Sequence, residues 1–170
     1  MPILCLVVLS VLGMIAGETE VTAQEFPMRP VRIVTTGAGG DGDFMSRVLA
    51  QALTESWGQQ VVVENRPAGV IPGQIVSKAP SDGYTLLCIA SAFWISPFLQ
   101  DTPYDPVRDF APVTLLATGP NVVVLHPSVP ANSIKELIAL AKARPGELNY
   151  AMGAIGSSAH LATELFKGAE

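Results

Sequence analysis

Cysteine is scarce in this 170-residue chain, which has only Cys5 and Cys88. Cys5 falls in an apolar run at the start and Cys88 in the apolar stretch 84–90, and neither stands at a metal-ligand spacing. This scarcity excludes a disulfide framework and a cysteine–histidine zinc site. We therefore expect Cys88 to be a lone buried thiol, and we expect no metal and no other cofactor.

Charged and aromatic side chains are also few, at 15% and 6% of the residues, whereas 49% are hydrophobic. The ten lysines and arginines do not cluster, which argues against nucleic acid and an anionic membrane surface as partners. A chain of this length and apolar content is expected to form one domain, or slightly more, around a real core.

A long apolar run, 3–17, is followed by the polar stretch 18–24. The run is shorter than the roughly 20 residues of a membrane-spanning helix, but it has the length of the apolar part of a signal peptide. Small residues, Val21 to Ala23, precede Gln24 as at a cleavage site, although no lysine or arginine precedes the run. We expect residues 1–23 to be a signal peptide; an uncleaved anchor and a buried core helix are the alternatives.

The rest of the chain alternates β-branched runs with helical patterns, which predicts βαβ units and an α/β fold with a parallel sheet. Ser133 and Glu136 form a capping box at the start of one helical pattern. We expect a change of sheet or domain near Gly119. Strands are expected at 31–36, 60–65, 84–90, 112–118, 121–126 and 148–152, and helices at 43–57, 74–78, 134–143 and 159–167.

The first glycine loop, residues 37–43, follows the first expected strand. With Glu64 it matches the dinucleotide fingerprint, as Gly37-x-Gly39-x-x-Gly42, so a Rossmann-like enzyme is one interpretation. Asp41 and Asp43 oppose it, because they put carboxylates where a pyrophosphate would lie, and Asp43 suits a helix N-cap. The loop could instead merely turn the chain, or present helix N-terminal amides to a small anion such as a ligand carboxylate.

The second glycine loop, residues 153–158, has the same design: a strand pattern, glycines, hydroxyls and a helix start. Ser157, Ser158 and His160 invite comparison with a nucleophile and its base. The loop is not G-x-S-x-G, however, and no acidic partner for the imidazole is identifiable. We therefore do not expect the chain to be an enzyme. A capping serine and a packed histidine are the simpler interpretation. Two such helix starts facing one cleft would hold a carboxylate without a cationic side chain.

A third loop is expected after the strand 84–90, at the carboxyl end of the sheet, where open α/β sheets bind ligands. Phe93 and Trp94 stand in this loop. Large aromatic side chains either line pockets or fill cores, and the sequence leaves both interpretations open.

Four segments follow one another along the chain: Glu64-Asn65-Arg66-Pro67, Asp82-Gly83-Tyr84, Tyr104-Asp105-Pro106 and Gly156-Ser157-Ser158-x-His160-Leu161. In this order they resemble the Bug family of extracytoplasmic solute receptors, the substrate-binding components of tripartite tricarboxylate transporters. The resemblance covers about 26–167.

The resemblance implies a fold like that of type II periplasmic binding proteins, with two lobes of mostly parallel sheet. Residues 24–119 would form part of the first lobe, and 120–170 the start of the second. It implies a monomeric periplasmic receptor that closes on a small organic acid or related solute and delivers it to the membrane components of a transporter. The implied ligand-binding residues are Gly39, Gly40, Asp43, Ser91, Ala92, Gly156, Ser157, Ser158 and His160.

The chain departs from the family pattern at three places: Thr35-Thr36 replaces an apolar–aromatic step, the segment after Arg66-Pro67 is short and contains Pro72, and Phe93-Trp94 adds bulk. Family members are about twice as long, so we expect a truncated chain that binds its ligand weakly or not at all, because a cleft needs both walls.

Overall fold

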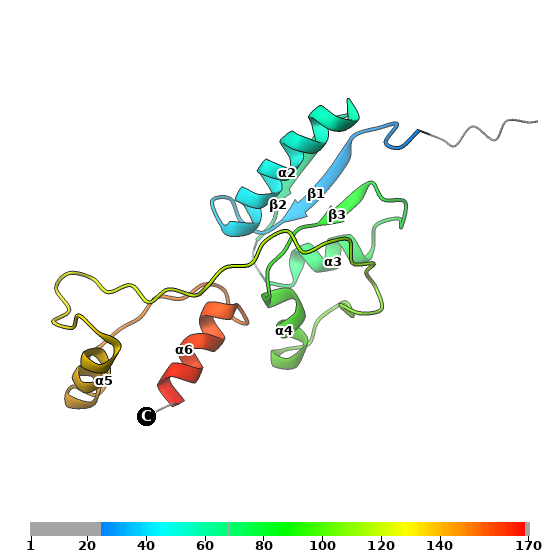
Figure 1. Ribbon diagram of the computed structural model, residues 1–170. Helices are drawn as coiled ribbons and strands as arrows, with labels where there is room; N and C mark the ends of the chain where they lie inside the picture. The colour runs from blue at the N-terminus through cyan, green and yellow to red at the C-terminus, as the bar shows by residue number, and fades with distance from the viewer. Residues whose placement is uncertain (1–24, 68, 169–170) are drawn as a thin grey trace, which may run out of the picture.

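Figure 1 shows the computed structural model of the chain, which describes residues 25–67 and 69–168. The expected signal peptide lies outside the described residues. Three parallel strands form one sheet in the order β2-β1-β3. They are β1 (Val31–Thr35), β2 (Val61–Asn65) and β3 (Thr85–Leu87). The predicted parallel α/β sheet is confirmed, and its central strand begins with Val31 opposite Val61.

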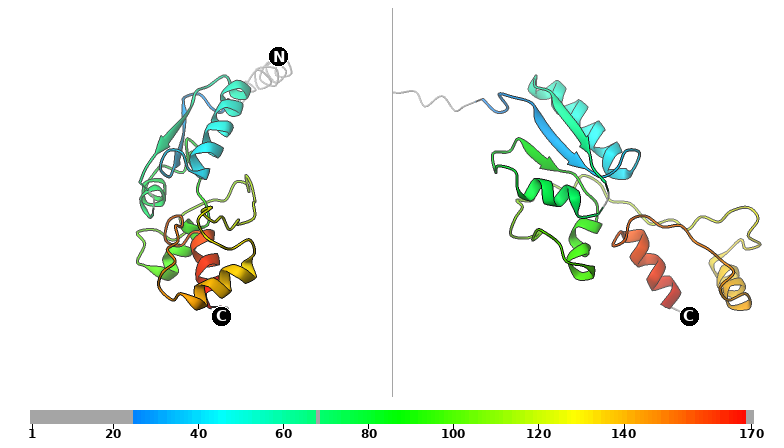
Figure 2. Two further views of the ribbon diagram at one scale, coloured as in Figure 1. Left: turned by 90° about the vertical axis from the view of Figure 1, so that its left-hand side faces the viewer. Right: turned by 180° about the vertical axis from the view of Figure 1, so that it is seen from behind.

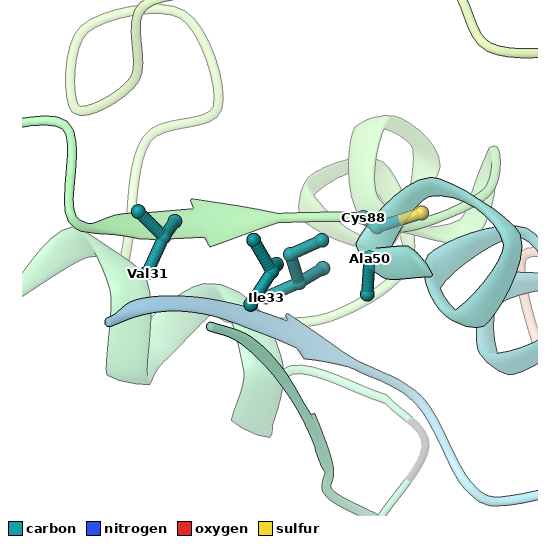
Figure 3. Packing of buried hydrophobic residues seen from close by; sticks show 5 residues of the cluster. Val31, Ile33, Ala50 and Cys88 are labelled. Atoms are coloured by element: carbon teal, nitrogen blue, oxygen red, sulfur yellow. The ribbon is translucent and has the colours of Figure 1, made fainter. Parts of the chain in front are cut away.

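Helix α2 (Asp41–Trp57) connects β1 to β2, and α3 (Ile71–Ser77) connects β2 to β3. The core of this unit lies between the sheet and the inner face of α2. It consists of the buried residues Val31, Ile33, Ala50, Val61 and Cys88 (Figure 3). Burial of a Val or Ile side chain stabilises the fold by about 1.5–3 kcal/mol. Cys88 is a free, buried thiol, as expected. Gly58 ends α2 in the left-handed conformation that glycine adopts readily.

The loop expected at 90–97 is wrong for most of its length, because helix α4 (Ala92–Leu99) forms there despite an internal proline. Pro97 has no N–H for the carbonyl of Phe93, which would be its helical acceptor. The hydroxyl of Tyr104 donates to that carbonyl oxygen instead, at 3.4 Å. A tertiary hydrogen bond thus compensates for the proline. The local sequence could not predict this bond, because its donor lies outside the helix. Phe93 is core and Trp94 is about half exposed, so the two aromatic residues have different roles.

Three predicted strands, 112–118, 121–126 and 148–152, are wrong: these segments form no β-ladder in the described residues. A strand requires a neighbour to complete its hydrogen bonds, and none pairs with them in residues 25–67 and 69–168. Many of their apolar side chains are therefore left exposed, as Val113 and Val124 are at 83% each.

Two further helices lie beside the α/β unit, away from the sheet (Figure 2). They are α5 (Ile134–Ala143) and α6 (Ser158–Gly168). Ser133 caps α5 by accepting from the amide of Glu136 at 3.2 Å. The reciprocal half of the predicted capping box differs, since the Glu136 carboxylate accepts from Asn132 N–H rather than from Ser133. Across the part of the chain that the structure describes, no helix has the length and apolar character to cross a membrane.

Candidate functional site

The first glycine loop is fixed by the buried carboxylate of Asp43. Gly39, at φ +84°, donates its N–H to Asp43 Oδ2 at 2.9 Å. The other oxygen, Oδ1, accepts from Asn65 Nδ2 at 2.8 Å and pairs with Arg47 Nε at 2.9 Å. The prediction that Asp43 is the N-cap of the helix is wrong. Gly40 holds that position, and Asp43 reaches back from the third helical residue because the glycine turn brings the Gly39 amide within range.

These contacts favour the ionised carboxylate. The hydrogen bond from Gly39 N–H, followed by those from Arg47 and Asn65, lowers the pKa of Asp43 from 3.8 to about 2. Asp43 is therefore negatively charged wherever the loop has this geometry. A second carboxylate placed on its oxygens would be repelled, so a ligand anion must approach the helix start from the side of its free amides.

We expect Asp43 to stabilise the fold fully above about pH 4 and to lose this contribution as the pH falls toward 2, because a depressed folded-state pKa acts in that direction. Thermal unfolding of the native chain and of Asp43→Asn, followed from pH 6 to pH 2, measures the difference in Tm between the two proteins. This difference should be largest near pH 6 and should vanish toward pH 2. Asp41→Asn, which removes an exposed carboxylate of the same turn, controls for the loss of one charge. A difference independent of pH would contradict the assignment.

The second glycine loop repeats this construction. Gly156, at φ +81°, donates its N–H to His160 Nδ1 at 3.1 Å, again to a side chain four residues later. Ser157 Oγ accepts from His160 N–H at 3.2 Å and so caps α6, as the simpler sequence interpretation expected. In this geometry Nδ1 is an acceptor, which places the ring proton on Nε2. His160 thus shapes the loop, in the way that Asp43 shapes the first one.

Ser91 joins the second glycine loop to the end of the sheet. Its Oγ accepts from Ser158 N–H at 3.0 Å, across 67 residues of sequence. Ser158 Oγ bonds Asn121 Oδ1 at 3.3 Å, and Gly156 lies against α4, whose first residue is the half-buried Ala92. Figure 1 shows the start of α6 beside the start of α4. Asn121 was not predicted, since a lone asparagine in an apolar run carries no motif.

The first glycine loop borders the same stretch of chain from the sheet side. Cys88, three residues before Ser91, donates from Sγ to Gly42 O at 3.8 Å. Segment 88–91 is therefore contacted by Gly42 near one end and by Ser158 at the other. The structure brings the three expected loops to one region, at the carboxyl end of β1 and β3.

Several predicted donors already bond within the chain: the amides of Gly39, Gly156 and Ser158. The first residues of each helix keep amides that have no intrahelical acceptor, because helix geometry leaves the first four N–H groups free of such partners. At α2 these begin with Asp41, directly after the Gly40 cap. The arrangement can hold an anion at the helix starts, with the glycine amides serving to fix the loops.

The dinucleotide interpretation needs a carboxylate at the end of β2 that is free to bind a ribose. Glu64 instead pairs with Arg32 at 3.1 Å and with Arg66. Burial alone would raise the pKa of Glu64, but the hydrogen bonds and charges of Arg66 and Arg32 outweigh it and lower the pKa. Glu64 is thus an ion-pair partner. In residues 25–67 and 69–168 no cluster of three or more acidic, histidine or cysteine side chains is placed to hold a metal.

Comparison with known proteins identifies the family to which the chain is similar. The profile of the tripartite tricarboxylate transporter family receptor matches residues 45–170. The chain is 42% identical over 153 residues to protein BugT of Bordetella pertussis, covering 86% of this chain and 47% of BugT. It is 40% identical over 144 residues to a Pseudomonas protein encoded in the tcbD-tcbE intergenic region, covering 82% and 43% of the two chains.

Solved structures agree. R. palustris Rpa4515 with adipate superposes with a TM-score of 0.74 at 36% identity, covering 84% of this chain and 49% of that one. The periplasmic binding protein BugD gives 0.72 at 32% identity, covering 85% and 50%. The chain thus spans about half the length of the relatives that it matches. BugD is described as a periplasmic binding protein. The chain belongs to the family of tripartite tricarboxylate transporter receptors.

Proposed function

We propose that the chain is part of an extracytoplasmic receptor that holds a carboxylate of a small organic acid at the starts of α2 and α6. The observation that carries this proposal is the repeated construction of the two glycine loops. In each, a left-handed glycine donates its amide to a side chain four residues later, on the first turn of a helix. A repeated and internally braced helix start is what a preorganised anion site requires.

The named residues have different tasks in this proposal. Asp43 and His160 brace the loops, and Gly40 lets the ligand approach the first amides of α2 closely. Ser157 supplies a hydroxyl, and the Ser158 hydroxyl fixes the start of α6 by donating to Asn121. Ser91 with Ala92 forms the wall between the loops. Each charge-assisted hydrogen bond would contribute about 1.5–3 kcal/mol, and each helix dipole about 0.3–1 kcal/mol.

We propose the wider role by analogy with the family. A relative of known structure is described with adipate, which makes linear dicarboxylates the first probes to choose. We propose that the chain acts in the periplasm after export, as a monomer, and delivers its solute to the membrane components of a tripartite transporter. We also propose that residues 24–119 belong to one lobe and 120–170 to the start of another.

Titration calorimetry with adipate, dimethyl adipate and NAD tests the proposal. We expect adipate to bind, and the dimethyl ester to fail because it lacks the charged groups that helix starts attract. We expect affinity weaker than micromolar for the 170-residue chain, since it spans about half the length of the relatives that it matches and a binding cleft needs both walls. Binding of NAD in preference to adipate would reject the receptor and favour the dinucleotide interpretation. Equal binding of the acid and its ester would reject the carboxylate site.

A further inference from the structure

Two hydroxyl groups are buried without a partner. Thr35 and Ser46 are each 0% exposed, and neither Thr35 Oγ1 nor Ser46 Oγ makes a hydrogen bond to any described residue. Buried side-chain hydroxyls nearly always make a hydrogen bond, because a hydroxyl that is removed from water and gains no replacement partner costs stability. Two exceptions in one small α/β unit therefore require a common explanation.

Both hydroxyls lie at one seam, between the end of β1 and the first two turns of α2. Thr35 is the last residue of β1, and its Oγ1 is 2.6 Å from the point that a Cβ of Gly42 would occupy. Ser46 stands one helical turn after Gly42, on the same face of α2. Ser46 therefore lies further along the same face of α2 on which Gly42 contacts Thr35.

More oxygen atoms gather at this seam. Thr36 Oγ1 lies 3.2 Å and the carbonyl oxygen of Cys88 lies 3.5 Å from the same Cβ point of Gly42. The three atoms nearest to this point are thus all oxygens, so the seam is polar. Thr35 Oγ1 and Ser46 Oγ nevertheless make no hydrogen bond to the described residues. Each hydroxyl can both donate and accept, so both still lack a partner.

The geometry points to one internal water molecule shared by Thr35 and Ser46. A water supplies two donors and two acceptors, and internal waters usually have two to four polar partners of this kind. It would tie the end of β1 to α2 directly below the first glycine loop and so help to fix the loop. This site is distinct from the helix-start amides, and it does not depend on which ligand the chain binds.

A double-mutant cycle tests the shared water. Thr35→Val and Ser46→Ala each remove one hydroxyl with little change of shape, and each leaves the other hydroxyl and the water short of a partner. We expect each single substitution to lower the Tm by about 2–4 °C, and the double variant to lower it no more than the worse single one. Thr35→Ser, which keeps the hydroxyl, should recover most of the loss. The control pairs Thr35→Val with Ser56→Ala, an exposed serine of α2, and should be additive.

Additive losses from Thr35→Val and Ser46→Ala would overturn the proposal. If a variant does not fold, the native chain decides. Water-to-protein NOE spectra should show a long-lived water close to both the Thr35 methyl group and the Ser46 β-protons. Contacts to neither residue, or to only one of them, would overturn the proposal as well.

Discussion

Phe93→Ala should destabilise the chain by about 3–5 kcal/mol, the usual cost of emptying a large buried aromatic site. Phe93 is 3% exposed, stacks on Tyr104 at 5.0 Å between centroids, and meets Phe110 edge-on at 4.8 Å. Its removal therefore leaves a cavity that these two stiff rings cannot collapse to fill. Since α4 also contacts Gly156, the second glycine loop should lose order as well.

Urea unfolding measures this loss, with Phe98→Ala as the matched control. Phe98 lies on the same helix but is 87% exposed, so its removal should change the free energy of unfolding by no more than about 0.5 kcal/mol. Equal midpoints for the two variants would show that α4 is not anchored through Phe93.

Gly42→Ala should be strongly damaging, although it adds only a methyl group to the first glycine loop. The new methyl group would stand 2.6 Å from Thr35 Oγ1, a fully buried group that cannot swing away, and 3.5 Å from the carbonyl oxygen of Cys88. Overpacking of this kind costs about 1–3 kcal/mol. The start of α2 must shift outward, so ligand affinity should fall along with stability.

Gly40→Ala is the adjacent control. Gly40 has φ −87°, which alanine adopts freely, and its Cβ would meet only Gly37 O at an ordinary 3.6 Å. Thermal unfolding should place Gly40→Ala close to the native chain and Gly42→Ala well below it. The reverse order would mean that the seam below the loop is looser than these distances indicate.

Much of the α/β unit follows from local patterns. The strand at Val31, the helix stop at Gly58 and the cap at Ser133 each depend on neighbouring residues, and each was predicted. The predictions that were wrong concern features that depend on residues distant in sequence. Helix α4 tolerates Pro97 because Tyr104 supplies the missing hydrogen bond, and the segments after Phe110 are not strands because no partner pairs with them in the described residues.

The candidate site was predictable in outline only. Glycines before a helix pattern located both loops, their common design paired them, and the family resemblance implied the same pairing. The N-cap assignment of Asp43 failed because the conformation of Gly39 decides which amide its carboxylate can reach. Asn121 and the contact of Ser91 with Ser158 join residues far apart in sequence, and periodicity carries no information about such pairs.

The central claim is that two braced helix starts hold one carboxylate. A titration of the isotope-labelled chain with adipate, followed by amide NMR shifts, tests it most directly. We predict that the amides of 39–43 and of 156–160 shift together along one binding curve, while those of α5 stay in place. Shifts confined to one loop, or two loops that titrate with different midpoints, would contradict a shared site.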